Sequence, residues 1–302
     1  MLLFIVLCSA LFCISPGSAS EGDRSPVFQK CVGKCTIENC TEDNSTYKYA
    51  SLQPAYHIHL LWPCKEECKY WCMWQAVDFF EERGWGVPQF HGKWPFVRIF
   101  GVQEPASVLF SLFNLVAHLN VLQKYRSKVP KFSPTYSLWK YHSMICINAW
   151  LWSSIFHTRD YPWTEMMDYF CAFSMVLFSF YAMVMRLLHC KMNLISITFS
   201  VICASFFIYH ITYLSIIHFD YAYNMKANIA IGILNGSCWL LWCTWKWLRH
   251  GETYVWRCAF SVVLALLTMS LEVLDFPPLY WTLDAHSLWH LSTTILPFIW
   301  NR

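Results

Sequence analysis

Seven apolar stretches dominate the sequence from residue 103 onward. Each holds roughly 20 residues, the length that an α-helix needs to cross about 30 Å of hydrocarbon. Such a helix satisfies its own backbone hydrogen bonds, which lipid cannot do. Only 14% of the residues are charged, whereas a soluble domain carries about 25%. We therefore expect an all-α polytopic membrane protein with seven transmembrane helices, near 103–122, 138–157, 163–185, 194–216, 225–245, 256–273 and 283–300.

The first 20 residues, MLLFIVLCSALFCISPGSAS, are an apolar run followed by small residues. This pattern is typical of a secretory signal that is cleaved around Ala19 or Ser20. A short first transmembrane helix is the alternative, but about 14 apolar residues before Pro16 are too few to span a bilayer comfortably. We predict a signal peptide over 1–20 and export of the following segment into the lumen.

Six cysteines lie between the signal and the first apolar stretch, in the patterns C-x3-C-x4-C and C-x3-C-x3-C. In an oxidising compartment these clusters predict three disulfides, with the pairing left open by the sequence. A zinc cluster is the alternative, but the C-x2-C knuckles typical of such sites are missing from the two clusters. We expect a small disulfide-rich lumenal domain over 21–97 and a transmembrane domain over 98–302. The six residues are Cys31, Cys35, Cys40, Cys64, Cys68 and Cys72.

Two further patterns indicate which side of the membrane each segment faces. Asn39 and Asn44 begin N-x-S/T sequons and are candidate glycosylation sites on the lumenal side. With a lumenal N-terminus, the basic residues concentrate in loops that face the cytosol, as the positive-inside rule requires. The C-terminus then faces the cytosol. These basic residues are Lys124, Arg126, Lys128, Lys131, Arg186, Lys191, Lys246, Arg249 and Arg257. The net charge of +3 is small, and the basic residues are not gathered on one face. Both observations argue against nucleic-acid binding.

Five polar residues are expected at one depth near the lumenal ends of three helices. Ser153 and His157 end the second stretch at i, i+4 spacing, and Asp168 lies a little over one turn into the third. His286 and His290 open the seventh stretch from the same side, again at i, i+4 spacing. An ionisable residue inside a membrane helix is costly and is therefore a candidate functional residue.

These residue types fit a catalytic zinc site. Three neutral imidazoles, from His157, His286 and His290, leave zinc an open fourth position for water. A nearby carboxylate, Asp168, can orient that water and move its proton. The Ser153 hydroxyl can stabilise an oxyanion. Taken singly, each residue has a plainer interpretation: the histidine pair is weak evidence, Ser153 is a packing hydroxyl, and Asp168 pairs with Arg159.

The set Ser153-x3-His157, Asp168 and His286-x3-His290 resembles the CREST superfamily of seven-helix membrane hydrolases. Within it, the cysteine-rich domain and the motifs PQFHGKWPF, QEPAS, NAWLWSSIFHTRD and MMDYF are similar to the GPI-anchor-remodelling phospholipases. The resemblance implies that the three histidines bind zinc, that Asp168 acts on the bound water, and that Ser153 stabilises the oxyanion or the outer shell of the metal.

The resemblance also implies a reaction and a location. The reaction removes the unsaturated sn-2 acyl chain from the inositol phospholipid of a GPI-anchored protein, so that GPI-anchored proteins and membrane lipid are the expected partners. The expected location is the Golgi membrane, with the endoplasmic reticulum as a second possibility. Two other functions stay open on the residues alone: a ceramidase-like amidase and a non-catalytic seven-helix receptor. A chaperone-like role with a structural metal is a further alternative.

Overall fold

The computed structural model describes residues 20–49, 60 and 62–300. The predicted signal peptide lies outside these residues apart from Ser20. Two compact units divide the chain. One consists of residues 17–105 together with 276–284, and we call it the cysteine unit. The other consists of residues 106–275 and 285–300 among the described ones, and we call it the helical unit.

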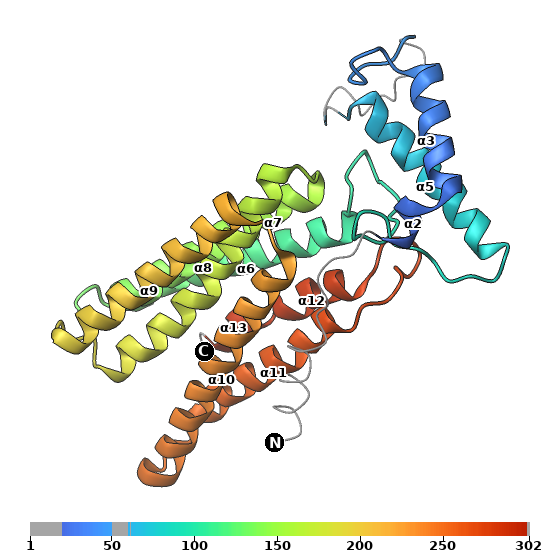
Figure 1. The fold of residues 1–302 in the computed structure, drawn as a ribbon. Coiled ribbons are helices and arrows are strands. Elements are labelled where there is room, and N and C mark those ends of the chain that lie inside the picture. Colours follow the sequence, from blue (N-terminus) through green and yellow to red (C-terminus); the bar gives the residue numbers. More distant parts are fainter. Residues whose placement is uncertain (1–19, 50–59, 61, 301–302) are drawn as a thin grey trace. The chain divides into compact units, whose positions relative to one another are not determined.

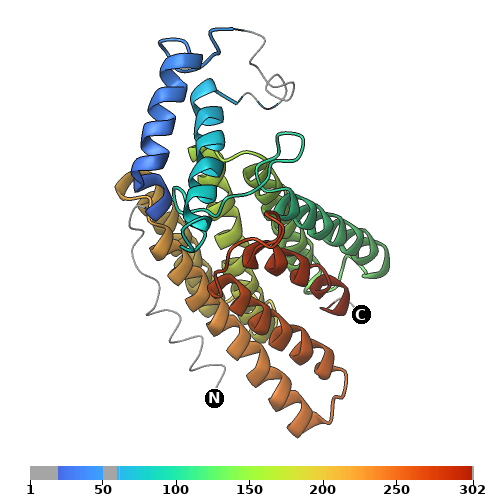
Figure 2. The same ribbon diagram turned by 90° about the vertical axis from the view of Figure 1, so that its right-hand side faces the viewer.

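The described part of the cysteine unit contains three helices, α2 (Glu21–Arg24), α3 (Pro26–Asn39) and α5 (Cys64–Glu81), joined and followed by irregular segments. Helices α3 and α5 pack side by side (Figures 1 and 2). Three disulfides join them, Cys31–Cys72, Cys35–Cys68 and Cys40–Cys64, with Cα–Cα distances of 5.6 to 5.7 Å. The predicted three disulfides are thus confirmed, and the nested pairing is what two antiparallel helices with cysteines on facing sides produce.

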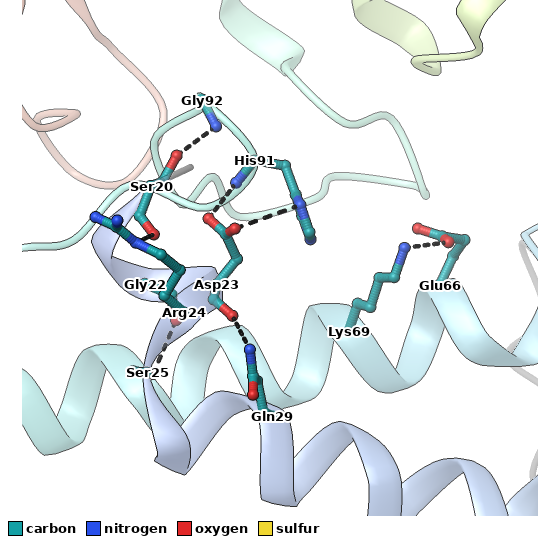
Figure 3. A network of polar contacts seen from close by, with 10 residues as sticks. All are labelled: Ser20, Gly22, Asp23, Arg24, Ser25, Gln29, Glu66, Lys69, His91 and Gly92. Carbon is teal, nitrogen blue, oxygen red and sulfur yellow. Dashed lines mark hydrogen bonds and ion pairs between the residues drawn. The ribbon is translucent and has the colours of Figure 1, made fainter. Parts of the chain in front are cut away.

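Main-chain N–H groups join the chain segment after α5 to the residues at the start of α2, two of them by donating to side-chain oxygens (Figure 3). Gly92 N donates to Ser20 Oγ at 2.6 Å, and His91 N donates to Asp23 Oδ1 at 3.0 Å. Gly22 N donates to Gln89 O at 3.0 Å. A Cβ on Gly22 would lie 2.5 Å from that same carbonyl oxygen. Glycine is therefore required at position 22 by a close approach of two backbones.

A buried ion pair holds the next part of this segment against α5. Arg98 Nη1 lies 2.6 Å from Glu67 Oε1, and the Glu67 side chain is fully buried. The guanidinium also stacks over the rings of Trp62 and Tyr70, at 3.5 and 4.3 Å from their centroids. Arginine suits this site because its planar group pairs with a carboxylate and stacks on aromatic rings together.

The helical unit contains α6 (Pro105–Lys128), α7 (Tyr136–Thr158), α8 (Pro162–Leu187), α9 (Leu194–Thr212), α10 (Tyr221–His250), α11 (Val255–Val273), α12 (Ala285–Thr293) and α13 (Leu296–Trp300). A π-helical turn, η2 (Tyr213–Ile217), extends α9. Helix α8 packs against α7, α9 and α10, and α11 packs against α10, α12 and α13 (Figures 1 and 2). Local signals set several ends: Asn193 caps the start of α9, and Gly251 ends α10 in the left-handed conformation at φ 64°.

Four described helices are long and apolar enough to cross a membrane: α6, α8, α9 with η2, and α10. They make the chain a multi-pass membrane protein. Helix α7 falls outside this group, and it is a helix with several buried polar side chains, among them Ser153, Ser154 and His157. Two of these side chains, Ser153 and His157, are candidate functional residues from the sequence.

The seventh predicted stretch, 283–300, differs from a single spanning helix. It forms two short helices, α12 and α13, separated at Thr294 and Ile295. Pro297 explains the break, because a proline inside a helix lacks an N–H and its ring clashes with the carbonyl four residues earlier. The hydroxyls of Thr293 and Thr294 both donate to the His290 carbonyl and so replace helical bonds at this point.

Candidate metal centre

Three histidines of the helical unit bring their ring nitrogens together. His157 comes from the last turn of α7, and His286 and His290 come from one face of α12. His286 Nε2 lies 3.3 Å from His157 Nε2 and 3.0 Å from His290 Nε2. All three ligand atoms lie within 4.8 Å of one another. The structure therefore joins three residues that are up to 133 positions apart, since 290 − 157 = 133.

This cluster is enclosed. His157 and His290 are buried and His286 is half-buried. The Trp150 ring meets the His290 ring edge-on, with centroids 5.2 Å apart, and Trp289 packs on it at the same distance. These aromatic contacts limit the rotamers open to the His290 imidazole.

The spacing of the nitrogens fits a tetrahedral metal. Two histidine nitrogens bound to one zinc ion at about 2.0–2.1 Å lie about 3.3 Å apart when the angle is tetrahedral. The observed separations of 3.3 and 3.0 Å are close to this value. Three histidines with a fourth position left over form the donor set of catalytic zinc sites. The residues present thus fit such an ion.

Ser153 does reach the cluster, but the hydrogen bond runs through a residue that the sequence analysis missed. Ser111 Oγ on α6 lies 2.7 Å from His290 Nδ1 and 3.1 Å from Ser153 Oγ. Ser111 is fully buried. A signal for it exists in the sequence: Ser107, Ser111 and Asn114 recur at helical spacing inside an apolar stretch, which places them on one inward face.

Asn114, the third member of that face, holds the main chain of the same histidine. Its Nδ2 donates to the His290 carbonyl at 2.6 Å, and its Oδ1 lies 3.3 Å from Thr293 Oγ1. Asn114 is fully buried as well. Helix α6 therefore contacts both the ring and the backbone of His290.

Asp168 lies in the second turn of α8 and is half-buried. Asp168 does not belong to the group of ligand atoms that lie within 4.8 Å of one another. That group consists of the three histidines. Helices α7 and α8 are joined by the short turn 159–161, in which Tyr161 N donates to Thr164 Oγ1 at 2.9 Å. This tight connection keeps the start of α8 beside the end of α7, where His157 lies.

A second cluster of ligand-type atoms, formed by Cys40, Cys64 and Cys68, lies in the cysteine unit. All three sulfurs belong to disulfides and so offer no thiolate to a metal. The zinc-cluster interpretation of the cysteines is therefore wrong. In the same region Asn39 donates from Nδ2 to the Cys35 carbonyl at 3.0 Å, and Asn44 lies in a turn with φ 61°.

The chain is similar in sequence to a known protein family and to several named proteins. A model of the Per1-like family matches residues 54–302. The "GPI-specific phospholipase A2-like PGAP3" of Danio rerio is 46% identical over 97% of this chain and 92% of its own length. The Homo sapiens protein of that name is 44% identical over 91% and 85%. "Post-GPI attachment to proteins factor 3" of Drosophila melanogaster is also 44% identical, over the same shares. No solved structure matches the chain.

Proposed function

The chain belongs to the Per1-like family, and we propose that it hydrolyses the sn-2 acyl ester of the inositol phospholipid in GPI-anchored proteins. The names of its relatives support the substrate class, because they refer to GPI and to phospholipase A2. The observation that carries the chemistry is the convergence of three imidazole Nε2 atoms, two of them on buried histidines, in the helical unit.

In this proposal His157, His286 and His290 hold a zinc ion through Nε2. When bound, zinc lowers the pKa of water towards about 7 and so supplies a nucleophile at neutral pH. Asp168 accepts the proton of the attacking water at a carboxylate oxygen and passes it to the leaving alcohol. Ser153 donates its hydroxyl hydrogen to the ester carbonyl oxygen as negative charge develops there.

We further propose a seven-span topology with the site at the lumenal leaflet. Helical segments lie at all seven apolar stretches, and the basic residues favour cytosolic loops at the other ends of the helices. The signal over 1–20, the cysteine domain over 21–97 and glycosylation at Asn39 and Asn44 belong to the same arrangement. Golgi membranes are the location we propose, because GPI-anchored proteins are displayed on the lumenal leaflet there.

The deciding experiment is mass spectrometry of the lipid chains on a GPI-anchored reporter. Cells that lack their own version of the protein receive this chain or its His286→Ala form. We expect the chain to restore exchange of the unsaturated sn-2 chain and the variant to fail. If both reach the Golgi and neither restores exchange, the assignment is wrong. Turnover of labelled ceramide by the purified chain would then favour the amidase alternative.

A further inference from the structure

We infer that Ser111 and Asn114, which we call the α6 clamp, position His290 for metal binding and set the direction of the Ser153 hydroxyl hydrogen. This inference rests on the proposed metal site and adds two residues to it. The clamp residues lie three positions apart on α6 and therefore on one face of that helix. Both are fully buried, and both contact the same histidine.

The first argument concerns protons. If His290 binds a metal through Nε2, its remaining ring proton lies on Nδ1. That N–H can only donate, and Ser111 Oγ is 2.7 Å away. With its oxygen accepting from His290, Ser111 directs its own hydrogen to Ser153 Oγ, 3.1 Å away. The chain of bonds then runs in one direction, from His290 through Ser111 to Ser153.

This direction has a consequence for Ser153. Because its oxygen accepts a bond from Ser111, its own hydrogen is available to donate elsewhere. A donor is what the carbonyl oxygen of an ester requires as it gains negative charge. Ser111 is thus a positioning residue: it orients the imidazole on one side and makes Ser153 a donor on the other.

The second argument concerns the helix that carries two of the histidines. Helix α12 has nine residues and ends where Pro297 prevents continuation. The last carbonyls of a helix lack helical partners, and His290 supplies one of them. Asn114 Nδ2 donates to this carbonyl at 2.6 Å from another helix, beside the Thr293 and Thr294 hydroxyls, which donate to it from the same chain segment. The amide therefore fixes the end of α12 and with it the position of His290.

A purely structural role would also explain buried hydroxyl and amide groups between membrane helices. The two explanations differ in what they predict for metal binding. Loss of a hydrogen-bond partner to a metal-bound histidine typically lowers metal affinity about 10–100-fold. Loss of a packing hydrogen bond elsewhere in the helical unit leaves metal affinity unchanged.

The test is a cobalt titration of the purified full-length chain in detergent, followed by the visible absorption of the bound ion. Ser111→Ala and Asn114→Leu are compared with wild type, and Ser111→Thr, which keeps the hydroxyl, tests rescue. Two control variants remove matched groups that hydrogen-bond to residues outside the cluster. Ser154→Ala removes a buried hydroxyl that bonds only within α7, at 2.8 Å to Trp150 O. Asn235→Leu removes an amide that bonds to Ser179 at 2.9 Å.

We expect Ser111→Ala and Asn114→Leu to bind cobalt about 10–100-fold more weakly, with an altered spectrum for Ser111→Ala. Ser111→Thr and both controls should match wild type. Wild-type affinity and spectrum in Ser111→Ala would overturn the clamp and leave the metal site standing. If wild type and His290→Ala bind cobalt alike, the metal site itself is wrong, and the clamp falls with it.

A kinetic test separates the two halves of the inference. Ser111→Ala, Ser153→Ala and the double variant are assayed for deacylation at saturating zinc. If Ser111 acts through Ser153, the double variant should be no slower than the slower single variant, because residues acting as one unit are not additive. Multiplied losses in the double variant would show that Ser111 does not set the Ser153 hydrogen.

Discussion

The cysteine unit and the helical unit differ in the partners of their buried polar side chains. In the cysteine unit a full ionic charge, Glu67, is buried, and it is matched by Arg98 between two aromatic rings. Around the histidines of the helical unit, the bonds that fix His290 come from neutral hydroxyl and amide groups. Burying charge costs several kcal/mol per ion unless it is paired, and in lipid a neutral partner avoids that cost.

The two units also differ in what holds their helices together. Helices α3 and α5 share three disulfides and a small apolar core around Phe28, Val77 and Phe90. A small domain with so little core depends on cross-links. In the helical unit the packing of long apolar helices provides most of the stability. The few polar residues inside it are therefore candidates for a functional role. We therefore expect damage to one unit to leave the other largely intact.

The largest effect should come from the histidine cluster. His290→Ala should abolish deacylation and remove bound metal, because the ion loses one of three protein ligands. Metal content by mass spectrometry and the lipid chains on a GPI reporter measure this. His218→Ala, which changes an exposed histidine outside the helices, is the control and should behave like wild type. A His290→Ala protein that keeps its metal would remove the basis of the comparison.

The buried ion pair gives the largest expected loss of stability. Glu67→Gln should lower the free energy of unfolding of the cysteine unit by about 3–5 kcal/mol, since Arg98 is left buried without its counter-charge. The neighbouring Glu66→Gln change affects a pair with Lys69 whose side chains are 40% and 31% exposed. It should cost less than about 1 kcal/mol. Equal losses in thermal unfolding would show that burial of the pair is unimportant.

Removal of one disulfide should have a somewhat smaller effect. Replacing Cys31 and Cys72 together with serine should destabilise the cysteine unit by about 2–5 kcal/mol, while metal binding by the helical unit persists. Protease resistance of the unit and cobalt binding by the same sample report the two results. The free cysteine Cys190 provides a control substitution to serine. Loss of metal binding in the double variant would contradict the separation of the units.

The smallest effect concerns two glycines of the cysteine unit. Gly22→Ala should cost about 1–3 kcal/mol, because the new methyl would lie 2.5 Å from Gln89 O and 2.7 Å from the Phe90 ring. Gly33→Ala, inside α3 with open space around it, should instead stabilise by about 0.5–1 kcal/mol. Thermal unfolding of the two variants should move in opposite directions. A shared direction would show that helix propensity outweighs the close approach at Gly22.

Sequence alone was enough for the features that depend on local pattern. Apolar length predicted helices at seven places, and cysteine spacing in a segment that we expect to be exported predicted the disulfides, though not their pairing. The i, i+4 spacing of His286 and His290, with His157 at a helix end, predicted a cluster that the structure assembles. Ser111 and Asn114 escaped because their role depends on which helix lies beside α12, and that is a matter of tertiary packing. Pro297 is a sequence signal for a break in the seventh stretch, but the apolar length of 283–300 favours a single helix, and the structure shows two.

The nested pairing of the cysteines imposes an order on biosynthesis. The innermost bond, Cys40–Cys64, closes a separation of 24 residues, and the next two close 33 and 41. During synthesis from the N-terminus, the last of the six cysteines to emerge is Cys72, which pairs with the first one, Cys31. The disulfides can therefore form in order from the inner pair to the outer pair. Each bond that has formed shortens the loop that the next one must close. Asn39 directly precedes Cys40, so its side chain lies beside the disulfide that closes the shortest loop.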